Sequence, residues 1–98
     1  MKHSLLADLL GEYIVERRRV LDITQTSLAH QLRCSAQFLG RIEKGYALMP
    51  KPALVKAISL LDLDPSRCRK IFRTAAENEV EELYKEARKA PRKKKTKR

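Results

Sequence analysis

The stretch that decides the fold is residues 24–45, which read TQTSLAHQLRCSAQFLGRIEKG. Thr24 and Ser35 are favoured N-cap residues, and each stands directly before a run of apolar and polar residues with helical spacing. The pattern therefore predicts one helix over 25–32 and a second over 36–44. Because so few residues separate the two helices, the chain must turn sharply between them.

Small and branched apolar residues mark the inner faces of these two helices. Ala29 and Leu39 are ten residues apart, at the positions where two steeply crossing helices touch, and the small Ala29 lets the helices approach closely. Gly45 then suits the left-handed position that ends a helix. A helix pair of this kind presents its second helix as a ridge that fits the major groove of DNA. We therefore expect a helix-turn-helix over about 25–45.

Three further helices are expected around this pair. Ser4 can cap a first helix that ends before Asp22. The apolar positions of that helix are Leu6, Leu10, Tyr13, Ile14, Val20 and Leu21. Pro50 and Pro52 bracket a loop, after which a fourth helix carries one apolar face. The residues of that face are Leu54, Ala57, Ile58 and Leu61.

The fifth helix starts at Asp64-Pro65, an N-cap followed by the residue favoured at the first helical position, and runs to about Lys89. Gly and Pro number only three and four in 98 residues, and Trp is absent. The composition thus predicts an all-α, five-helix domain with an aliphatic core. Its expected parts are a DNA-binding domain over 1–64, a C-terminal helix over 65–90 that is a candidate dimerisation element, and a disordered basic tail over 91–98.

The formal net charge of +10 favours a polyanionic partner, but it is unevenly distributed. The last eleven residues, 88–98, contain eight basic and no acidic side chains, so the remaining 87 residues carry only +2. Two readings of the tail stay open. It is either a solvated chain end or a non-specific clamp that adds phosphate contacts.

The segments 24–29 and 34–45 resemble the helix-turn-helix of the phage-repressor family, also called Cro-like or xenobiotic-response-element regulators. The resemblance extends over roughly residues 9–65 and implies a lambda-repressor-like fold for the five-helix domain. Its most specific parts are the Gln-x-x-Leu-Ala opening at Gln25 and the Ile-Glu-x-Gly close that ends at Gly45.

The resemblance implies a DNA-binding role for particular residues. Gln25 corresponds to a glutamine that contacts a phosphate and braces the recognition helix. Ala36, Gln37 and Arg41 fall where family members touch base edges, and Lys44 and Tyr46 fall where phosphates are held. The implied DNA contacts are Gln25, Ala36, Gln37, Phe38, Gly40, Arg41, Lys44 and Tyr46.

The chemistry of these side chains agrees with that role. Arg41 can donate two parallel hydrogen bonds to guanine, and Gln37 can pair with adenine. Ala36 and Phe38 offer apolar atoms to a thymine methyl group. Gly40, inside the recognition helix, costs about 1 kcal/mol relative to alanine. It either permits close approach to DNA or is simply tolerated.

Two other positions bear on the internal structure. Glu43 corresponds to a family glutamate that pairs with an arginine of the first helix, and Arg18 occupies the matching position. Arg33 stands where the family usually has glycine, and a left-handed conformation there costs a non-glycine residue roughly 1–2 kcal/mol.

Other classes of function find little support in the residues. Cys34 and Cys68 are expected to be free thiols in a reducing compartment. His3 and His30 have no second ligand nearby, so we expect no metal. No nucleophile, base and orienting acid stand together in the sequence, so we expect no enzyme activity, and we expect no cofactor. The leucine-rich start is interrupted by Asp8 and is too short for a membrane span, so we expect a cytoplasmic, nucleoid-associated protein.

These observations predict a sequence-specific regulator of transcription, a repressor that binds double-stranded DNA as a homodimer. Late apolar positions of the fifth helix, such as Val80 and Leu83, either meet a partner subunit or fold back on Leu5, Leu6 and Leu9. Two alternatives remain. One is an antitoxin-like protein that binds a toxin and controls its own operon, and the other is a weakly specific nucleoid protein.

Overall fold

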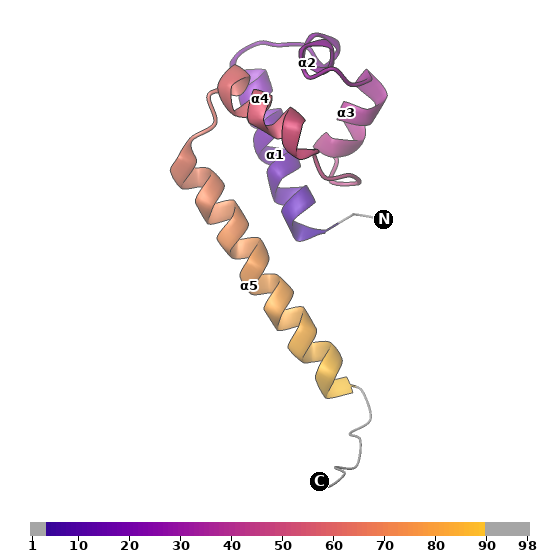
Figure 1. Ribbon diagram of the computed structural model, residues 1–98, viewed down its shortest axis with the longest axis vertical. Helices are drawn as coiled ribbons and strands as arrows, with labels where there is room; N and C mark the ends of the chain where they lie inside the picture. The colour runs from indigo at the N-terminus through magenta and orange to yellow at the C-terminus, as the bar shows by residue number, and fades with distance from the viewer. Residues whose placement is uncertain (1–3, 90–98) are drawn as a thin grey trace, which may run out of the picture.

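The computed structural model describes residues 4–89 and contains, in that range, five α-helices and no strand (Figure 1). The helices are α1 (Leu5–Val20), α2 (Gln25–Gln31), α3 (Ala36–Glu43), α4 (Lys51–Leu61) and α5 (Pro65–Lys89). The expected all-α class with five helices is confirmed. The tail expected over 91–98, together with His3, lies outside the described residues.

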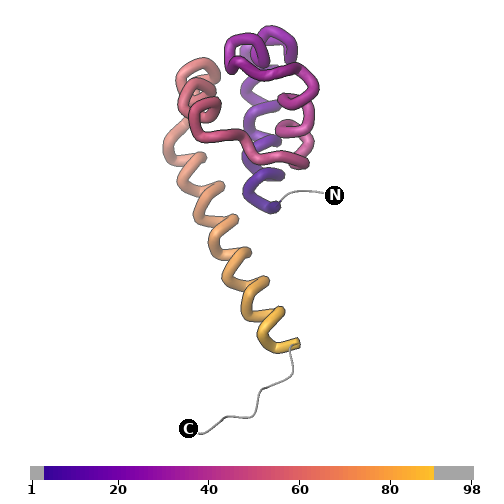
Figure 2. The backbone as a smooth tube through the Cα atoms, turned by 45° about the vertical axis from the view of Figure 1, so that its right-hand side comes forward, coloured from indigo at the N-terminus to yellow at the C-terminus, as the bar shows by residue number. Residues whose placement is uncertain are grey.

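Helix α1 is the centre of the molecule. It packs against α3, α4 and α5, and α2 packs against α3. The first four helices form a compact head, and α5 leaves this head as a single long rod (Figures 1 and 2). Each of the short helices α2 and α3 therefore depends on its neighbours for its position.

The core inside the head is aliphatic, as the composition predicts. Its largest fully buried side chains are Leu10, Ile14, Leu28, Leu39, Ile42 and Leu61. The buried aromatic ring of Tyr13 has its hydroxyl satisfied, because the backbone N–H of Asp64 donates to it at 2.8 Å. The guanidinium of Arg67 lies 4.2 Å from the centre of the same ring. Tyr13 thus ties the start of α5 to α1.

The N-caps follow from the sequence in four helices. The side-chain oxygens of Ser4, Thr24, Ser35 and Asp64 each accept a hydrogen bond from the backbone N–H three residues later, at 3.0–3.1 Å. Helix α4 begins without a side-chain cap, at Pro50. The expected loop over Pro50–Pro52 is wrong, because Pro52 lies in the first turn of α4, where a missing N–H costs no intrahelical bond.

The first four helices end in the same way, with one residue in the left-handed conformation. The φ angles are 57° at Asp22, 60° at Arg33, 83° at Gly45 and 52° at Asp62. After each of them, the next backbone N–H donates to a carbonyl five residues back, at 2.8–3.0 Å. This is the Schellman arrangement, which satisfies orphan carbonyls at a helix end. Only one of the four positions carries the glycine that suits it.

The expected apolar faces of α1 and α4 need correction at their edges. Val20 is 65% exposed, Leu21 40% and Ile58 45%. Val20 lies roughly 120° around the helix from the buried Ile14, so it points away from the core. Arg17, in the last turn of α1, turns inward, and its Nε donates to the carbonyl of Leu61 at 3.0 Å.

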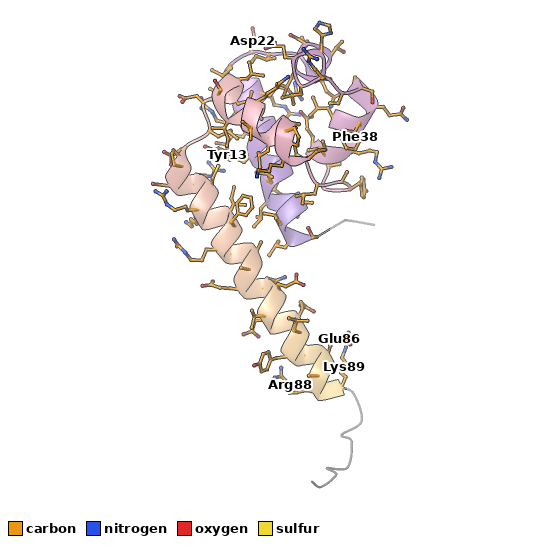
Figure 3. All side chains as sticks on the ribbon, viewed as in Figure 1. Tyr13, Asp22, Phe38, Glu86, Arg88 and Lys89 are labelled. Atoms are coloured by element: carbon orange, nitrogen blue, oxygen red, sulfur yellow. The ribbon has the colours of Figure 1, made fainter. Side chains whose placement is uncertain are left out.

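Only the first half of α5 docks on the head. Ile71 is buried and Cys68 is partly buried, whereas every residue from Ala76 to Lys89 is exposed, including Glu86 and Arg88 at the far end (Figure 3). The alternative in which the late apolar residues fold back on α1 is therefore wrong. Among the described helices, none has both the length and the apolarity needed to cross a bilayer.

Replacing Arg33 by glycine should stabilise the protein, because Arg33 holds a left-handed φ of 60°. We expect Arg33→Gly to raise the free energy of unfolding by about 1 kcal/mol. Arg33→Ala, which removes the same charge but keeps the backbone strain, should give no gain. Urea unfolding of both variants measures the difference, and equal stability of the two would contradict the strain argument.

Candidate nucleic-acid interface

The α2–α3 pair forms a small two-helix unit closed by a tight turn. Its inner side is built from Leu28, Ala29, Leu39 and Ile42, all at most 2% exposed. In the turn, Arg33 and Cys34 donate backbone N–H bonds to the last carbonyls of α2 at 3.1 and 3.0 Å. The turn therefore has a defined geometry, and it leaves one side of α3 facing outward.

Two of the base-reading residues expected from the sequence lie on that outward side. Gln37 and Arg41 are exposed, and their spacing of four residues places them on one face, one turn apart. Within residues 4–89, neither side chain has a hydrogen-bond or ion-pair partner. Ala36, at the start of α3, is partly buried. Both long polar side chains are thus free to bind another molecule.

Phe38 and Gly40 lie on other sides of α3. Phe38 is partly buried and packs against the core, next to Met49. A Cβ atom built on Gly40 would lie 3.6 Å from Nε2 of Gln25, an ordinary contact. Gly40 therefore faces the start of α2, and its lack of a side chain is not required by the packing.

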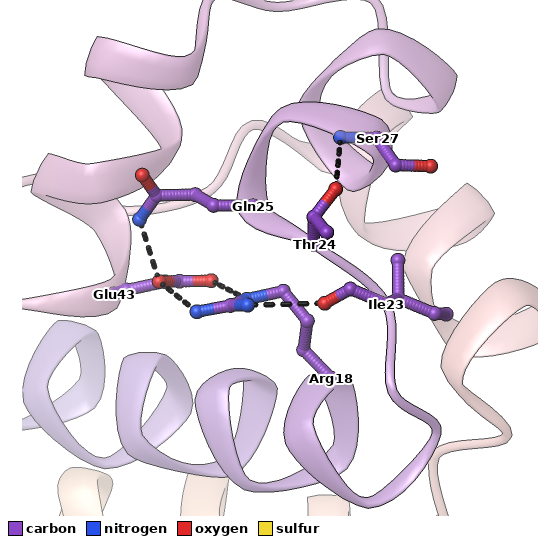
Figure 4. A network of polar contacts seen from close by, with 6 residues as sticks. All are labelled: Arg18, Ile23, Thr24, Gln25, Ser27 and Glu43. Carbon is purple, nitrogen blue, oxygen red and sulfur yellow. Dashed lines mark hydrogen bonds and ion pairs between the residues drawn. The ribbon is translucent and has the colours of Figure 1, made fainter.

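A polar network fixes the end of α3 to α1 and α2 (Figure 4). The Glu43 carboxylate accepts from Nε of Arg18 at 2.7 Å, from Nη2 of Arg18 at 3.1 Å and from Nε2 of Gln25 at 2.9 Å. Arg18 also donates from Nη1 to the carbonyl of Ile23 at 3.0 Å. We call Arg18, Gln25 and Glu43 the brace. The ion pair that the resemblance implies is thus present, and it also includes Gln25.

The brace is shielded from solvent, since the side chains of Arg18 and Glu43 are only 13% and 6% exposed. Charges in such a place are costly unless each is paired and hydrogen-bonded. Here the two hydrogen bonds from Arg18 to Glu43, the bond from Gln25 to Glu43 and the bond from Arg18 to the carbonyl of Ile23 meet that condition.

A glycine is a second constraint on the packing near the brace, because a Cβ atom at Gly11 would overlap the carbonyl oxygen of Ile42. The close approach of α1 and α3 therefore requires a glycine.

Three other predicted residues share one hollow beside the brace. Gln25, Gly40 and Lys44 line a pocket of about 410 Å³ together with Glu12, Val15, Arg18, Arg19 and Glu43. Lys44 and Arg19 are exposed cations at this hollow. Arg19 joins this site because α1 packs against α3, a contact that the local sequence pattern does not reveal. Tyr46, 42% exposed, follows just after α3.

The two cysteines are free, and each is half-buried. Burial raises the pKa of the Cys34 thiol and is also the main cause that raises the pKa of Cys68. Both thiols are therefore neutral at physiological pH. In the part of the chain that the structure describes, no three His, Cys, Asp or Glu side chains gather as metal ligands would.

Comparisons of the chain with models of protein families, with curated proteins and with solved structures give no match.

Removing the charge of Glu43 should weaken the head strongly. We expect Glu43→Gln to lower the free energy of unfolding by roughly 2–3 kcal/mol, because it leaves the shielded Arg18 without its counter-charge. Glu16→Gln is the matched control, since Glu16 pairs with Arg67 at 2.8 Å where both side chains are about half exposed. That change should leave stability nearly unaltered. Urea unfolding of both variants provides the test, and similar losses would contradict a structural role for the brace.

Proposed function

We propose that the chain is a sequence-specific regulator of transcription that binds double-stranded DNA through a helix-turn-helix formed by α2 and α3. The observation that carries this proposal is the outward face of α3. Gln37 and Arg41 lie there one turn apart and unpaired within the described residues. The brace holds the helix that carries them. A rigid helix with free base-reading side chains is the device by which such proteins recognise the major groove.

Geometry and chemistry support base reading by this face. One helical turn advances about 5.4 Å, while base pairs are stacked about 3.4 Å apart. Gln37 and Arg41 can therefore reach base pairs that are neighbours or nearly so. Arg41 would donate to O6 and N7 of guanine, and Gln37 would pair with N6 and N7 of adenine. Ala36 precedes Gln37 at the N-terminal end of α3, where its partly buried methyl group would contact a thymine methyl group.

Phosphate contacts would come from the hollow beside the brace. Nε2 of Gln25 carries two hydrogens, and Glu43 accepts one of them. The other can donate to a phosphate oxygen. Lys44 and Arg19 add two cations at the same place, and Tyr46 follows nearby. Contacts of this kind set the position of the protein on DNA without reading the sequence.

Arg41→Ala tests base reading. We expect it to lower the affinity for the selected operator about tenfold or more and to relax the preference at one base pair, since one bidentate contact discriminates by about 1–3 kcal/mol. Arg73→Ala on α5 is the matched control and should change little. The measurement is selection of bound fragments from a random DNA pool, followed by fluorescence anisotropy with each variant. If Arg41→Ala lowered the affinity for all DNA sequences equally, Arg41 would be a phosphate contact. If the random pool gave no consensus sequence, the proposal would be contradicted.

The proposal includes a homodimer, and the far half of α5 supports it. Val80 is 52% exposed, Leu83 58% and Tyr84 64%. Phe72, Ala76, Val80, Leu83 and Ala87 recur every three or four residues, so they form one stripe along the helix. A helix without tertiary contacts is marginal in water. A second copy of the same stripe would cover these residues and stabilise the projecting end.

Leu83→Glu tests this interface. Sedimentation at micromolar concentration should give a dimer for the wild-type chain and a monomer for the variant, because the added charge would be buried between the helices. Lys85→Glu is the control, since it places a glutamate two positions along, on roughly the opposite side of α5. A wild-type chain that sediments as a monomer both with and without DNA would contradict the homodimer.

The same exposed stripe favours one alternative function. An antitoxin-like protein would use it to hold a toxin and would use α3 only to control its own operon. Purification of the chain in complex with one small partner, bound through Leu83, would support that reading. A weakly specific nucleoid protein would instead bind random DNA as tightly as any selected sequence.

A further inference from the structure

We propose that a pocket on the inner flank of α3 binds a small amphipathic anion, that is, an apolar molecule with one carboxylate or similar group. The pocket has a volume of about 340 Å³ and lies between the α2–α3 turn, α3 and the first turns of α4. It is distinct from the hollow beside the brace. Its walls are formed by Leu32, Arg33, Cys34, Phe38, Ile42, Met49, Pro50, Pro52, Ala53 and Lys56.

The packing of the helices explains why a pocket exists here. Helix α3 packs against α1 and α2, while α4 packs against α1. The space between α3 and the start of α4 is thus lined by side chains, among them Met49 and Phe38, which is labelled in Figure 3. The floor is apolar, since Leu32, Ile42 and Met49 are at most 4% exposed. An apolar molecule that entered would replace water against these side chains, which is favourable.

The charged groups at the rim decide the class of ligand. Arg33 and Lys56 line the pocket, both are exposed, and no acidic residue lines it. Within residues 4–89, neither cation has an ion-pair partner. Two free cations at the edge of an apolar pocket favour a ligand with an apolar body and a negative end.

The volume limits the size of the ligand. Small-molecule sites have volumes of about 300–1,000 Å³, so this pocket is at the small end of the range. A water molecule accounts for about 30 Å³ of liquid, so the pocket has room for a molecule of roughly ten non-hydrogen atoms. Octanoate matches this description in size, apolarity and charge, and it serves as the probe.

One consequence rests on the proposed function. A ligand in the pocket contacts Phe38 and Ile42, which lie about 100° around α3 from Gln37 and Arg41. Occupancy would then alter the position of the helix that we propose reads DNA. The binding itself does not depend on that function, and the experiment below therefore contains no DNA.

The test uses the thiol of Cys34 as a reporter, since it lines the pocket. In the full chain with Cys68→Ala, Cys34 is the remaining thiol. Its alkylation by iodoacetamide is followed with increasing octanoate, and with 1-octanol and octylammonium as neutral and cationic probes of the same length. We expect octanoate to slow the reaction in a saturable way, and to bind about fivefold or more tightly than either other probe.

Two charge variants on α4 complete the design. For each variant, the rate of Cys34 alkylation is measured with and without octanoate, so that a change in the intrinsic reactivity of the thiol does not affect the comparison. Lys56→Glu should weaken octanoate protection about fivefold or more. Lys51→Glu is the matched control, because Lys51 is also an exposed α4 lysine but does not line the pocket. Circular dichroism verifies that both variants are folded. Absence of saturable protection, equal protection by all three probes, or equal loss in both variants would each overturn the proposal.

Discussion

The carboxylate of Glu43 is the point on which the arrangement of the head depends. It lies at the end of α3 and accepts hydrogen bonds from Arg18 on α1 and Gln25 on α2. One side chain therefore joins three helices. Helices of seven and eight residues, such as α2 and α3, are far too short to persist alone in water. Their structure comes from the core beneath them, and their mutual orientation is fixed by this shielded charge.

An acid on a surface proposed to meet DNA would ordinarily oppose binding. The brace resolves this conflict, because Glu43 is 6% exposed and its charge is matched by Arg18. The cations that remain free on the same side of the molecule include Arg41 and Lys44. The outward face of α3 thus keeps a positive character even though its helix contains a shielded negative charge. The structural charge of Glu43 and the free charges of Arg41 and Lys44 thus lie close together in the sequence, within residues 41–44.

Local features of the fold could be predicted from the sequence, and features that depend on distant packing could not. The caps at Thr24 and Ser35 and the helix end at Gly45 follow from rules that involve only neighbouring residues. The spacing of Gln37 and Arg41 also places them on one face without further information. By contrast, the inward turn of Arg17 and the role of Arg19 depend on which helices lie beside α1. The half-buried position of Phe38 depends in the same way on the start of α4.

Helix α5 combines two different kinds of stability in one continuous element. Ile71 is buried against the head, so we expect the backbone around it to open only when the head unfolds. From Ala76 to Lys89 every residue is exposed, so we expect this part of the helix to fray independently. Amide hydrogens along α5 should therefore exchange with solvent at rates that rise steeply within a few turns. Any molecule that covers the far end would flatten this gradient, so the exchange rates along one helix would report whether the end is occupied.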